Sequence, residues 1–103
     1  MILGKYRQWA MGKCFYCQRE TYRTNQTIMP DWAYTRDHLI PRRLRGKVYA
    51  KLPDYLTTVV CCYKCNILKK DMSVQKFINK YLTLEQRKRI PLNRIQSLYR
   101  LNE

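Results

Sequence analysis

Two closely spaced pairs of cysteines constrain the fold of this chain more than any other feature of its sequence. The first pair lies in C-F-Y-C at residues 14–17 and the second in C-Y-K-C at residues 62–65, with 44 residues between them. Each C-x-x-C turn brings two sulfur atoms within reach of one ion, and two turns complete a tetrahedral thiolate shell that suits zinc. The spacing predicts a structural zinc site made by Cys14, Cys17, Cys62 and Cys65, since four protein ligands leave no position for a reacting water.

Other uses of these cysteines fit the spacing less well. Inert buried cysteines would not favour two C-x-x-C turns, and a redox C-x-x-C needs only one pair. The fifth cysteine, Cys61, is expected to be a small buried residue at the end of an apolar strand. A C-x-x-x-C pairing of Cys61 with Cys65 is a less common alternative. Because zinc would close a long segment of a small chain, its binding should contribute directly to the free energy of folding.

The charge of the chain indicates an anionic partner. Lys and Arg number 21 against 7 Asp and Glu, a formal charge of +14 over 103 residues. The first half carries 11 basic and 3 acidic residues and the second half 10 and 4, so the excess is not confined to a tail. Like charges repel in a compact chain, and so large an excess favours nucleic acid over an anionic membrane or plain solubility.

Length and hydropathy exclude several classes of protein. The length fits a single domain spanning 1–103, and 46% hydrophobic residues are enough for one modest core. No run approaches the ~20 apolar residues of a membrane-spanning helix, so no membrane partner is expected. The start M-I-L-G-K lacks the apolar core of a signal peptide. The chain is therefore expected in the cytoplasm or another intracellular compartment, where its cysteines would not form structural disulfides.

Apolar periodicity, β-branched runs and capping residues predict the order of the elements. The pattern indicates a helix over 2–12, a loop over 19–32 with strand character near 27–28, a strand over 33–40, a basic loop over 42–54 and a strand over 56–61. A helix should begin between Cys62 and Cys65. Ser73 is a candidate N-cap, Thr83 with Gln86 a capping box, and Pro91 the first turn of a last helix.

The residues that could carry chemistry lie on the predicted strand–loop–strand–helix segment over 33–70. Asp37 and His38 are adjacent on the first strand, and His38 is the only histidine of the chain. Asn66 follows Cys65 directly, and residues 69 and 70 share its helix face at i+3 and i+4. Taken singly, Asp37 could instead pair with a nearby arginine, and Asn66 could make a hydrogen bond at the start of the helix.

This ordered set resembles the HNH, or ββα-metal, endonuclease family. The matching pieces are C-x-x-C at 14–17, T-R-D-H-L-I-P at 35–41, the apolar strand V-V-C at 59–61 and C-x-x-C-N-x-x-K at 62–69. The resemblance covers roughly residues 8–78. It implies an α+β fold, with a ββα-metal core, a structural four-cysteine zinc site and flanking helices that include a helical C-terminal extension over 73–103.

The resemblance also implies a mechanism for hydrolysing phosphodiester bonds in DNA. His38 would be the general base that takes a proton from the attacking water. Asp37 and Asn66 would bind a catalytic Mg²⁺ or Mn²⁺, which keeps waters and takes its other ligands from phosphate. The expected partner is double-stranded DNA, and the oligomeric state stays open. A small standalone member is compatible with a phage or mobile-element origin, which would place it in the host cytoplasm.

One position departs from the family pattern. Members carry a middle Asn about five residues before the second C-x-x-C, where it helps to hold the ββ loop and the histidine, and here that position is Thr57. A hydroxyl can make a hydrogen bond but lacks the two ends of an amide, so Thr57 is only a candidate for orienting His38. The basic residues expected to contact phosphate around the site are Arg36, Arg42, Arg43, Arg45, Lys47, Lys69 and Lys70.

Two further classes of function compete with the nuclease. A catalytically weak or inactive HNH fold would be a zinc-stabilised module that binds nucleic acid, which Thr57 favours and Asp37, His38 and Asn66 oppose. An adaptor, for instance in DNA packaging, would depend on protein contacts, for which the C-terminal helices leave room. Cation-dependent cleavage of DNA would distinguish a nuclease from an inactive module. Capture of a protein partner without DNA would distinguish an adaptor from both.

Overall fold

An antiparallel pair of strands, β3 (Tyr34–His38) and β4 (Thr58–Cys62), lies at the centre of the computed structural model, which describes residues 10–101. The β-branched run at 58–60 favours the extended conformation, and residues 59, 61 and 62 are buried. In the register of the pair, Tyr34 lies opposite Cys62 and His38 opposite Thr58. The central hairpin therefore links the second C-x-x-C at one end to the Asp37-His38 dipeptide near the other.

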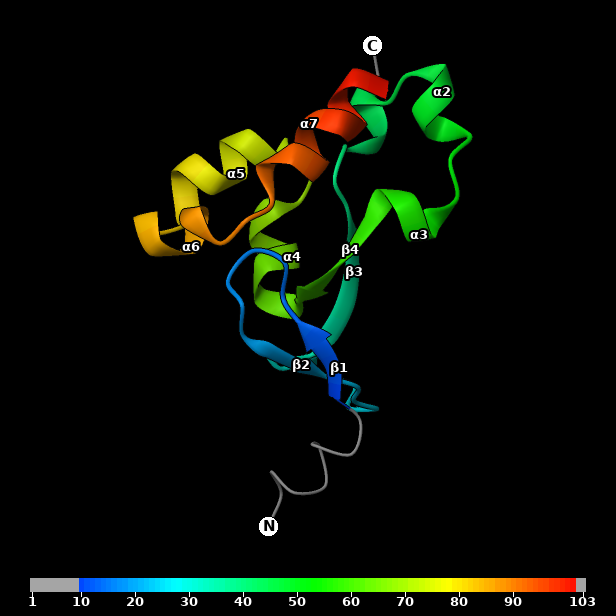
Figure 1. Cartoon of the computed structure of the whole chain (residues 1–103). Coiled ribbons are helices and arrows are strands. Elements are labelled where there is room, and N and C mark those ends of the chain that lie inside the picture. Colours follow the sequence, from blue (N-terminus) through cyan, green and yellow to red (C-terminus); the bar gives the residue numbers. More distant parts are fainter. Residues whose placement is uncertain (1–9, 102–103) are drawn as a thin grey trace.

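A smaller sheet carries the first C-x-x-C. Strands β1 (Ala10–Lys13) and β2 (Glu20–Tyr22) are antiparallel, and residues 14–17 lie in the connection between them. The connection is closed by a hydrogen bond from the Cys14 amide to the Arg19 carbonyl, and the Phe15 amide donates to the Val60 carbonyl of β4, each at 2.8 Å. This last bond ties the small sheet to the central hairpin. In Figure 1, β1 and β2 lie below β4.

Helix α4 (Tyr63–Lys69) follows β4 without a loop and packs beside both strands of the central hairpin (Figure 1). It begins at Cys62, whose sulfur accepts a hydrogen bond from the Cys65 amide, and it ends at Lys70, where φ is +49°. The predicted helix start between Cys62 and Cys65 is confirmed. The order strand, strand, helix places one face of α4 against β3.

Three helices complete the C-terminal part of the described chain. They are α5 (Val74–Tyr81), α6 (Leu84–Lys88) and α7 (Leu92–Leu101). The Ser73 hydroxyl accepts from the Lys76 amide, and Thr83 and Gln86 form both bonds of a capping box, as predicted. Buried side chains from these helices and from the connections between them join the core at 74, 77, 78, 82, 90, 95 and 98. The helical C-terminal extension is thus part of the same hydrophobic core as the central hairpin.

The segment between β3 and β4 is more helical than predicted. It holds the 3₁₀ turn η1 (Arg42–Leu44) and two short helices, α2 (Lys47–Ala50) and α3 (Asp54–Thr57). The predicted loop over 42–54 and strand start at 56 are therefore wrong. Pro53 takes φ −69° at the N-cap of α3 and Asp54 lies in its first turn, an arrangement that starts a helix despite the β-branched residues that follow.

Other predicted boundaries also change. The strand over 33–40 is shorter, since β3 ends at His38, although the Leu39 amide still donates to the Thr57 carbonyl. The loop over 19–32 contains strand β2, and residues 27–28 form no strand. The predicted helix over 2–12 is wrong where it can be checked, because Ala10 and Gly12 lie in β1; its residues 2–9 lie outside the described part.

The described residues thus form an α+β fold with two small sheets, several helices and a cluster of four cysteines. The α+β class is as predicted. Within residues 10–101, every helix is too short or too polar to cross a membrane.

Candidate functional site

The four predicted ligand cysteines converge on one point. Their sulfur atoms all lie within 4.8 Å of one another, and the Cys17 and Cys62 sulfurs are 3.7 Å apart. A tetrahedron with Zn–S bonds of about 2.3 Å has edges of about 3.8 Å, so the sulfurs are spaced to hold one zinc ion. Cys14 and Cys17 come from the β1–β2 connection, and Cys62 and Cys65 from the junction of β4 and α4. The cluster is therefore a possible metal site, consistent with structural zinc.

Cys61 is buried beside this cluster and does not belong to it. Hydrogen bonds from neighbouring thiols, Cys17 first, hold the pKa of Cys14 well below its usual range, and contacts with Cys14 raise the pKa values of Cys62 and Cys65. The contact with Cys14, together with burial, raises the pKa of the Cys61 thiol, and its sulfur donates to the Cys62 carbonyl at 3.3 Å. Cys61 has no exposed surface, as expected of a small core residue.

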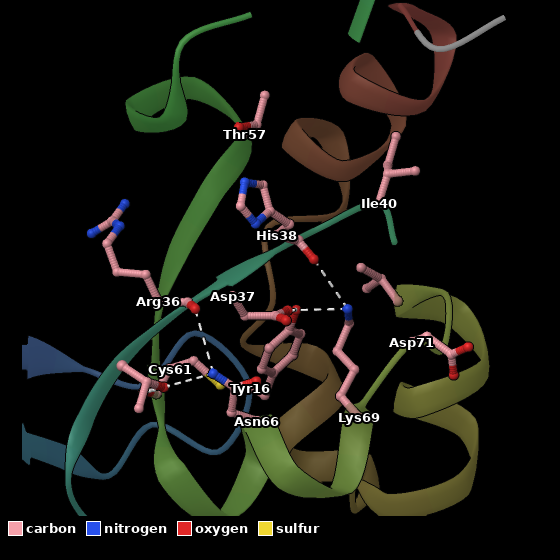
Figure 2. Close-up of polar contacts among 12 residues, drawn as sticks. Tyr16, Arg36, Asp37, His38, Ile40, Thr57, Cys61, Asn66, Lys69 and Asp71 are labelled. Carbon is pink, nitrogen blue, oxygen red and sulfur yellow. Dashed lines mark hydrogen bonds and ion pairs between the residues drawn. The ribbon is translucent and has the colours of Figure 1, made fainter. Parts of the chain in front are cut away.

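Asp37 is held by two donors at a single carboxylate oxygen. The Tyr16 hydroxyl donates to Oδ2 at 2.6 Å, and the ammonium of Lys69 lies 3.1 Å from the same oxygen. The side chains of Asp37 and Lys69 are 7% and 1% exposed, so this is a buried ion pair. Figure 2 shows the pair between β3 and α4, with Tyr16 below it. Asp37 therefore pairs with Lys69, and not with Arg36 or Arg42 as the alternative reading of the sequence had it.

Asn66 reaches from α4 to β3. Its amide nitrogen donates to the Thr35 hydroxyl at 3.0 Å and to the Arg36 carbonyl at 3.4 Å. Among the described residues both bonds use Nδ2, so Oδ1 is the atom through which Asn66 could ligate a cation. The structure therefore does not show the alternative, in which Asn66 would make a hydrogen bond at the start of α4. Asn66 fixes α4 to the strand that carries Asp37 and His38.

The imidazole of His38 lies on the other side of β3 from the Asp37 carboxylate in Figure 2, as alternation along a strand requires. Its Nε2 is 3.5 Å from Oδ1 of Asp54, in the first turn of α3, and the side chains are 39% and 86% exposed. The carbonyl of His38 accepts from the Lys69 ammonium at 3.1 Å. His38 is thus anchored through its backbone and open to solvent at its ring.

Thr57 does not orient the histidine through its side chain. Its hydroxyl donates to the Pro53 carbonyl at 3.5 Å, within α3. The loop after His38 is instead closed by Tyr49, whose buried hydroxyl accepts from the Ile40 amide at 3.3 Å and donates to the Thr57 carbonyl at 3.1 Å. The phenol of Tyr49 therefore makes a two-ended bridge across the base of the hairpin, where a threonine side chain could not.

Tyr49→Phe should lower the free energy of unfolding by about 1–3 kcal/mol, since the buried Ile40 amide would lose its acceptor. Tyr55→Phe is a matched control on the same segment, because Tyr55 is 74% exposed, and it should change stability by less than about 0.5 kcal/mol. Urea denaturation of zinc-loaded protein measures both. Equal stabilities of the two variants would show that the bridge contributes nothing.

An open depression of about 220 Å³ lies over these residues. It is lined by Arg36, Asp37, His38, Pro41, Arg42, Arg45, Asn66, Lys70 and Asp71. Of the residues predicted to contact phosphate, Arg36, Arg42, Arg45 and Lys70 lie on this rim, and Lys47 is exposed on α2 outside it. Arg43 is exposed and bonds Asp71 at 3.1 Å. Lys69 differs from the prediction, because its ammonium is buried against Asp37 and does not lie on the surface.

Sequence reasoning missed three residues that hold the candidate site. Tyr16 lies between Cys14 and Cys17, and nothing local to that turn indicates a contact with Asp37, 21 residues away. No local pattern in the sequence indicates the bridging role of Tyr49, whose partners lie at positions 40 and 57. Asp54 follows a proline at a helix start, and that start could have been recognised from the Pro-Asp pair.

No family model, curated protein or solved structure matches the chain. The likeness to HNH endonucleases therefore depends on the motifs of residues 8–78 alone. The function of the depression has to be argued from the side chains that line it.

Proposed function

We propose that this protein is a metal-dependent DNA endonuclease of the HNH type, with β3, β4 and α4 as its ββα-metal core. The observation that carries the proposal is the composition of the depression. A histidine, a carboxylate and a carboxamide from β3 and α4 line it together, and four basic side chains lie around them. This combination offers a proton acceptor, oxygen ligands and phosphate contacts within one surface.

His38 is the general base in this proposal. Its ring is partly exposed in the depression, where a water could reach it, and Asp54 contacts Nε2. The other ring nitrogen, Nδ1, would accept the proton of that water as its oxygen attacks phosphorus. The carboxylate of Asp54 would stabilise the imidazolium that results, since an opposite charge near a histidine favours its protonated form.

Asp37 and Asn66 are the residues that would hold the catalytic cation. Both present an oxygen that the described hydrogen bonds leave unused, Oδ1 in each case. Hard cations such as Mg²⁺ and Mn²⁺ prefer oxygen ligands, and Mg²⁺ takes few from protein. When bound, the cation would neutralise charge on the phosphate and the leaving 3′ oxygen.

The rim residues would position the DNA backbone. Arg36 is fixed by bonds to the Thr58 hydroxyl and carbonyl at 2.8 and 3.1 Å, and Arg45 by a bond to the Ile40 carbonyl at 3.0 Å. Both guanidinium groups are thus oriented before DNA arrives. Contacts of this kind bind any sequence, so affinity should fall steeply with salt and sequence preference should be weak.

The test is cleavage of supercoiled plasmid by zinc-loaded protein. Wild-type protein should nick or linearise the plasmid with added Mg²⁺ or Mn²⁺ and not with EDTA. Asp37→Asn should cleave the plasmid at least about tenfold more slowly, because the cation would lose its charged ligand. The matched control is Asp71→Asn, whose carboxylate lines the same depression but is exposed and paired with Arg43, and which should cut at nearly the wild-type rate.

Other results would contradict the proposal that the protein is a nuclease. Plasmid binding without cleavage in any divalent cation would favour the zinc-stabilised module that only binds nucleic acid. Absence of DNA binding at low salt, together with capture of a protein partner that does not need DNA, would favour the adaptor. Equal loss of cleavage in Asp37→Asn and Asp71→Asn would show that neither carboxylate is specifically a cation ligand.

A further inference from the structure

The carboxylate of Asp37 already has a cationic partner before any metal binds. Its Oδ2 is 3.1 Å from the ammonium of Lys69 and 2.6 Å from the hydroxyl of Tyr16, and all three side chains are buried. A buried ion pair is screened far less by solvent than a surface pair, so most of the charge of Asp37 is compensated locally. A dication approaching Oδ1 would meet a carboxylate paired with a fixed positive charge.

The other carboxylate that lines the depression is compensated as well. Asp71 is paired with Arg43 at 3.1 Å, and Asp54, which contacts His38 at 3.5 Å, is not among the residues that line the depression. Asn66 is neutral, and the remaining charged side chains on the rim are those of Arg36, Arg42, Arg45 and Lys70. Among the described residues that line the depression, positive charge is therefore in excess, and this field repels a divalent cation.

The scissile phosphate supplies the charge that the protein lacks. Mg²⁺ is commonly held by one or two carboxylates together with substrate phosphates, which would here be the only uncompensated anions in the depression. The same positive rim that repels the free cation attracts the DNA backbone. Once a phosphate is seated, it offsets the rim charge and offers oxygen ligands beside Oδ1 of Asp37 and Oδ1 of Asn66.

We infer that Lys69 makes cation binding depend on DNA: the free protein binds Mg²⁺ or Mn²⁺ weakly, and the DNA complex binds it in the ternary site formed with the phosphate. The inference rests on the proposed function and adds an order of assembly to it. Lys69 acts as a positioning residue, through Asp37. Because coupling between two ligands is reciprocal, the cation should tighten DNA binding by the same factor as DNA tightens cation binding.

The test measures Mn²⁺ binding by electron paramagnetic resonance, which quantifies the free hydrated ion. Zinc-loaded His38→Ala protein is used so that the DNA stays intact. Mn²⁺ is titrated into the protein alone, a short DNA duplex alone and their mixture at low salt. The mixture should show one site per protein with a dissociation constant at least about tenfold lower than that of the free protein.

Two neutral substitutions then identify the charge responsible. Lys69→Gln keeps a donor for Asp37 or for the His38 carbonyl but removes the ammonium, and should tighten Mn²⁺ binding to the DNA-free protein by about tenfold or more. Lys70→Gln removes an equal charge from an exposed residue on the same rim. It should change the Mn²⁺ dissociation constant of the DNA-free protein less than threefold, because solvent screens an exposed charge. Zinc content and circular dichroism show whether each variant is folded.

These titrations distinguish failure of this inference from failure of the proposed function. Equal Mn²⁺ affinity with and without DNA would overturn the dependence on DNA while leaving a cation site in place. No protein site in either state would overturn the proposed function itself. If Lys69→Gln does not fold, the comparison of bound and free protein in the His38→Ala background still decides the inference.

Discussion

Cys62→Ser should lose the zinc ion and, with it, the folded state of the described chain. Cys62 contributes to the four-sulfur cluster and is also the N-cap of α4, where its sulfur accepts from the Cys65 amide. Structural zinc in small domains contributes about 10–16 kcal/mol of apparent binding free energy, against a typical total stability of about 5–15 kcal/mol. Elemental analysis should give much less than one zinc per chain, and circular dichroism should show loss of helix.

Cys61→Ala is the matched control on the neighbouring residue. Cys61 is equally buried but lies outside the cluster, so one zinc per chain should remain and stability should fall by only about 1–2 kcal/mol. Treatment of wild-type protein with a strong chelator should reproduce the unfolding of Cys62→Ser. If Cys62→Ser keeps a full complement of zinc, or if Cys61→Ala loses it, the four-cysteine assignment is wrong.

The sequence predicted the parts of the fold that local chemistry determines. A C-x-x-C turn needs only its own backbone to place two sulfurs together, and the two turns must meet if they share an ion. The Ser73 and Thr83 caps likewise depend on hydroxyls within three residues of the amides that they accept from. The two caps agree with the structure because their partners are close in the chain, and the C-x-x-C turns agree because their spacing is that of a shared metal site.

The segment between β3 and β4 could not be predicted in the same way. Leu56 and the threonines that follow favour a strand, but the Thr57 carbonyl accepts from Leu39 and Tyr49 only if α3 ends there. Those contacts join residues that are 18 and 8 positions apart. Tertiary hydrogen bonds therefore override the local β-propensity, and only the structure shows where helix gives way to strand.

The candidate site, like the fold, could be predicted only in part from the sequence. Asp37, His38 and Asn66 were found from their order and spacing, and the structure brings all of them to one depression. The partners of Asp37 were not predicted, because Tyr16 and Lys69 approach it from the first C-x-x-C turn and from α4. Lys69, at i+3 from Asn66, was predicted to contact phosphate, yet the structure buries its ammonium against Asp37 of β3. Helix periodicity predicts which residues share a face of α4, and packing decides whether that face is buried.

His38→Ala should reduce cation-dependent plasmid cleavage by about 10²–10⁴-fold while leaving DNA binding nearly unchanged. The imidazole is the only histidine ring in the chain and lies in the depression with its Nε2 beside Asp54. Removing it deletes the proton acceptor but leaves the basic rim and the residues proposed to hold the cation. Initial rates of nicking and salt-dependent binding to the same plasmid measure the two effects separately.

Free imidazole and a second substitution distinguish a chemical role of His38 from a structural one. Added imidazole should restore part of the activity of His38→Ala and should not restore Asp37→Asn, because only the first variant lacks a base. Asp54→Asn keeps the ring and removes the carboxylate that would stabilise its protonated form, so it should lose less activity than His38→Ala. Cleavage by His38→Ala at the wild-type rate would exclude this histidine as the base, and loss of zinc from it would show that the ring supports the fold.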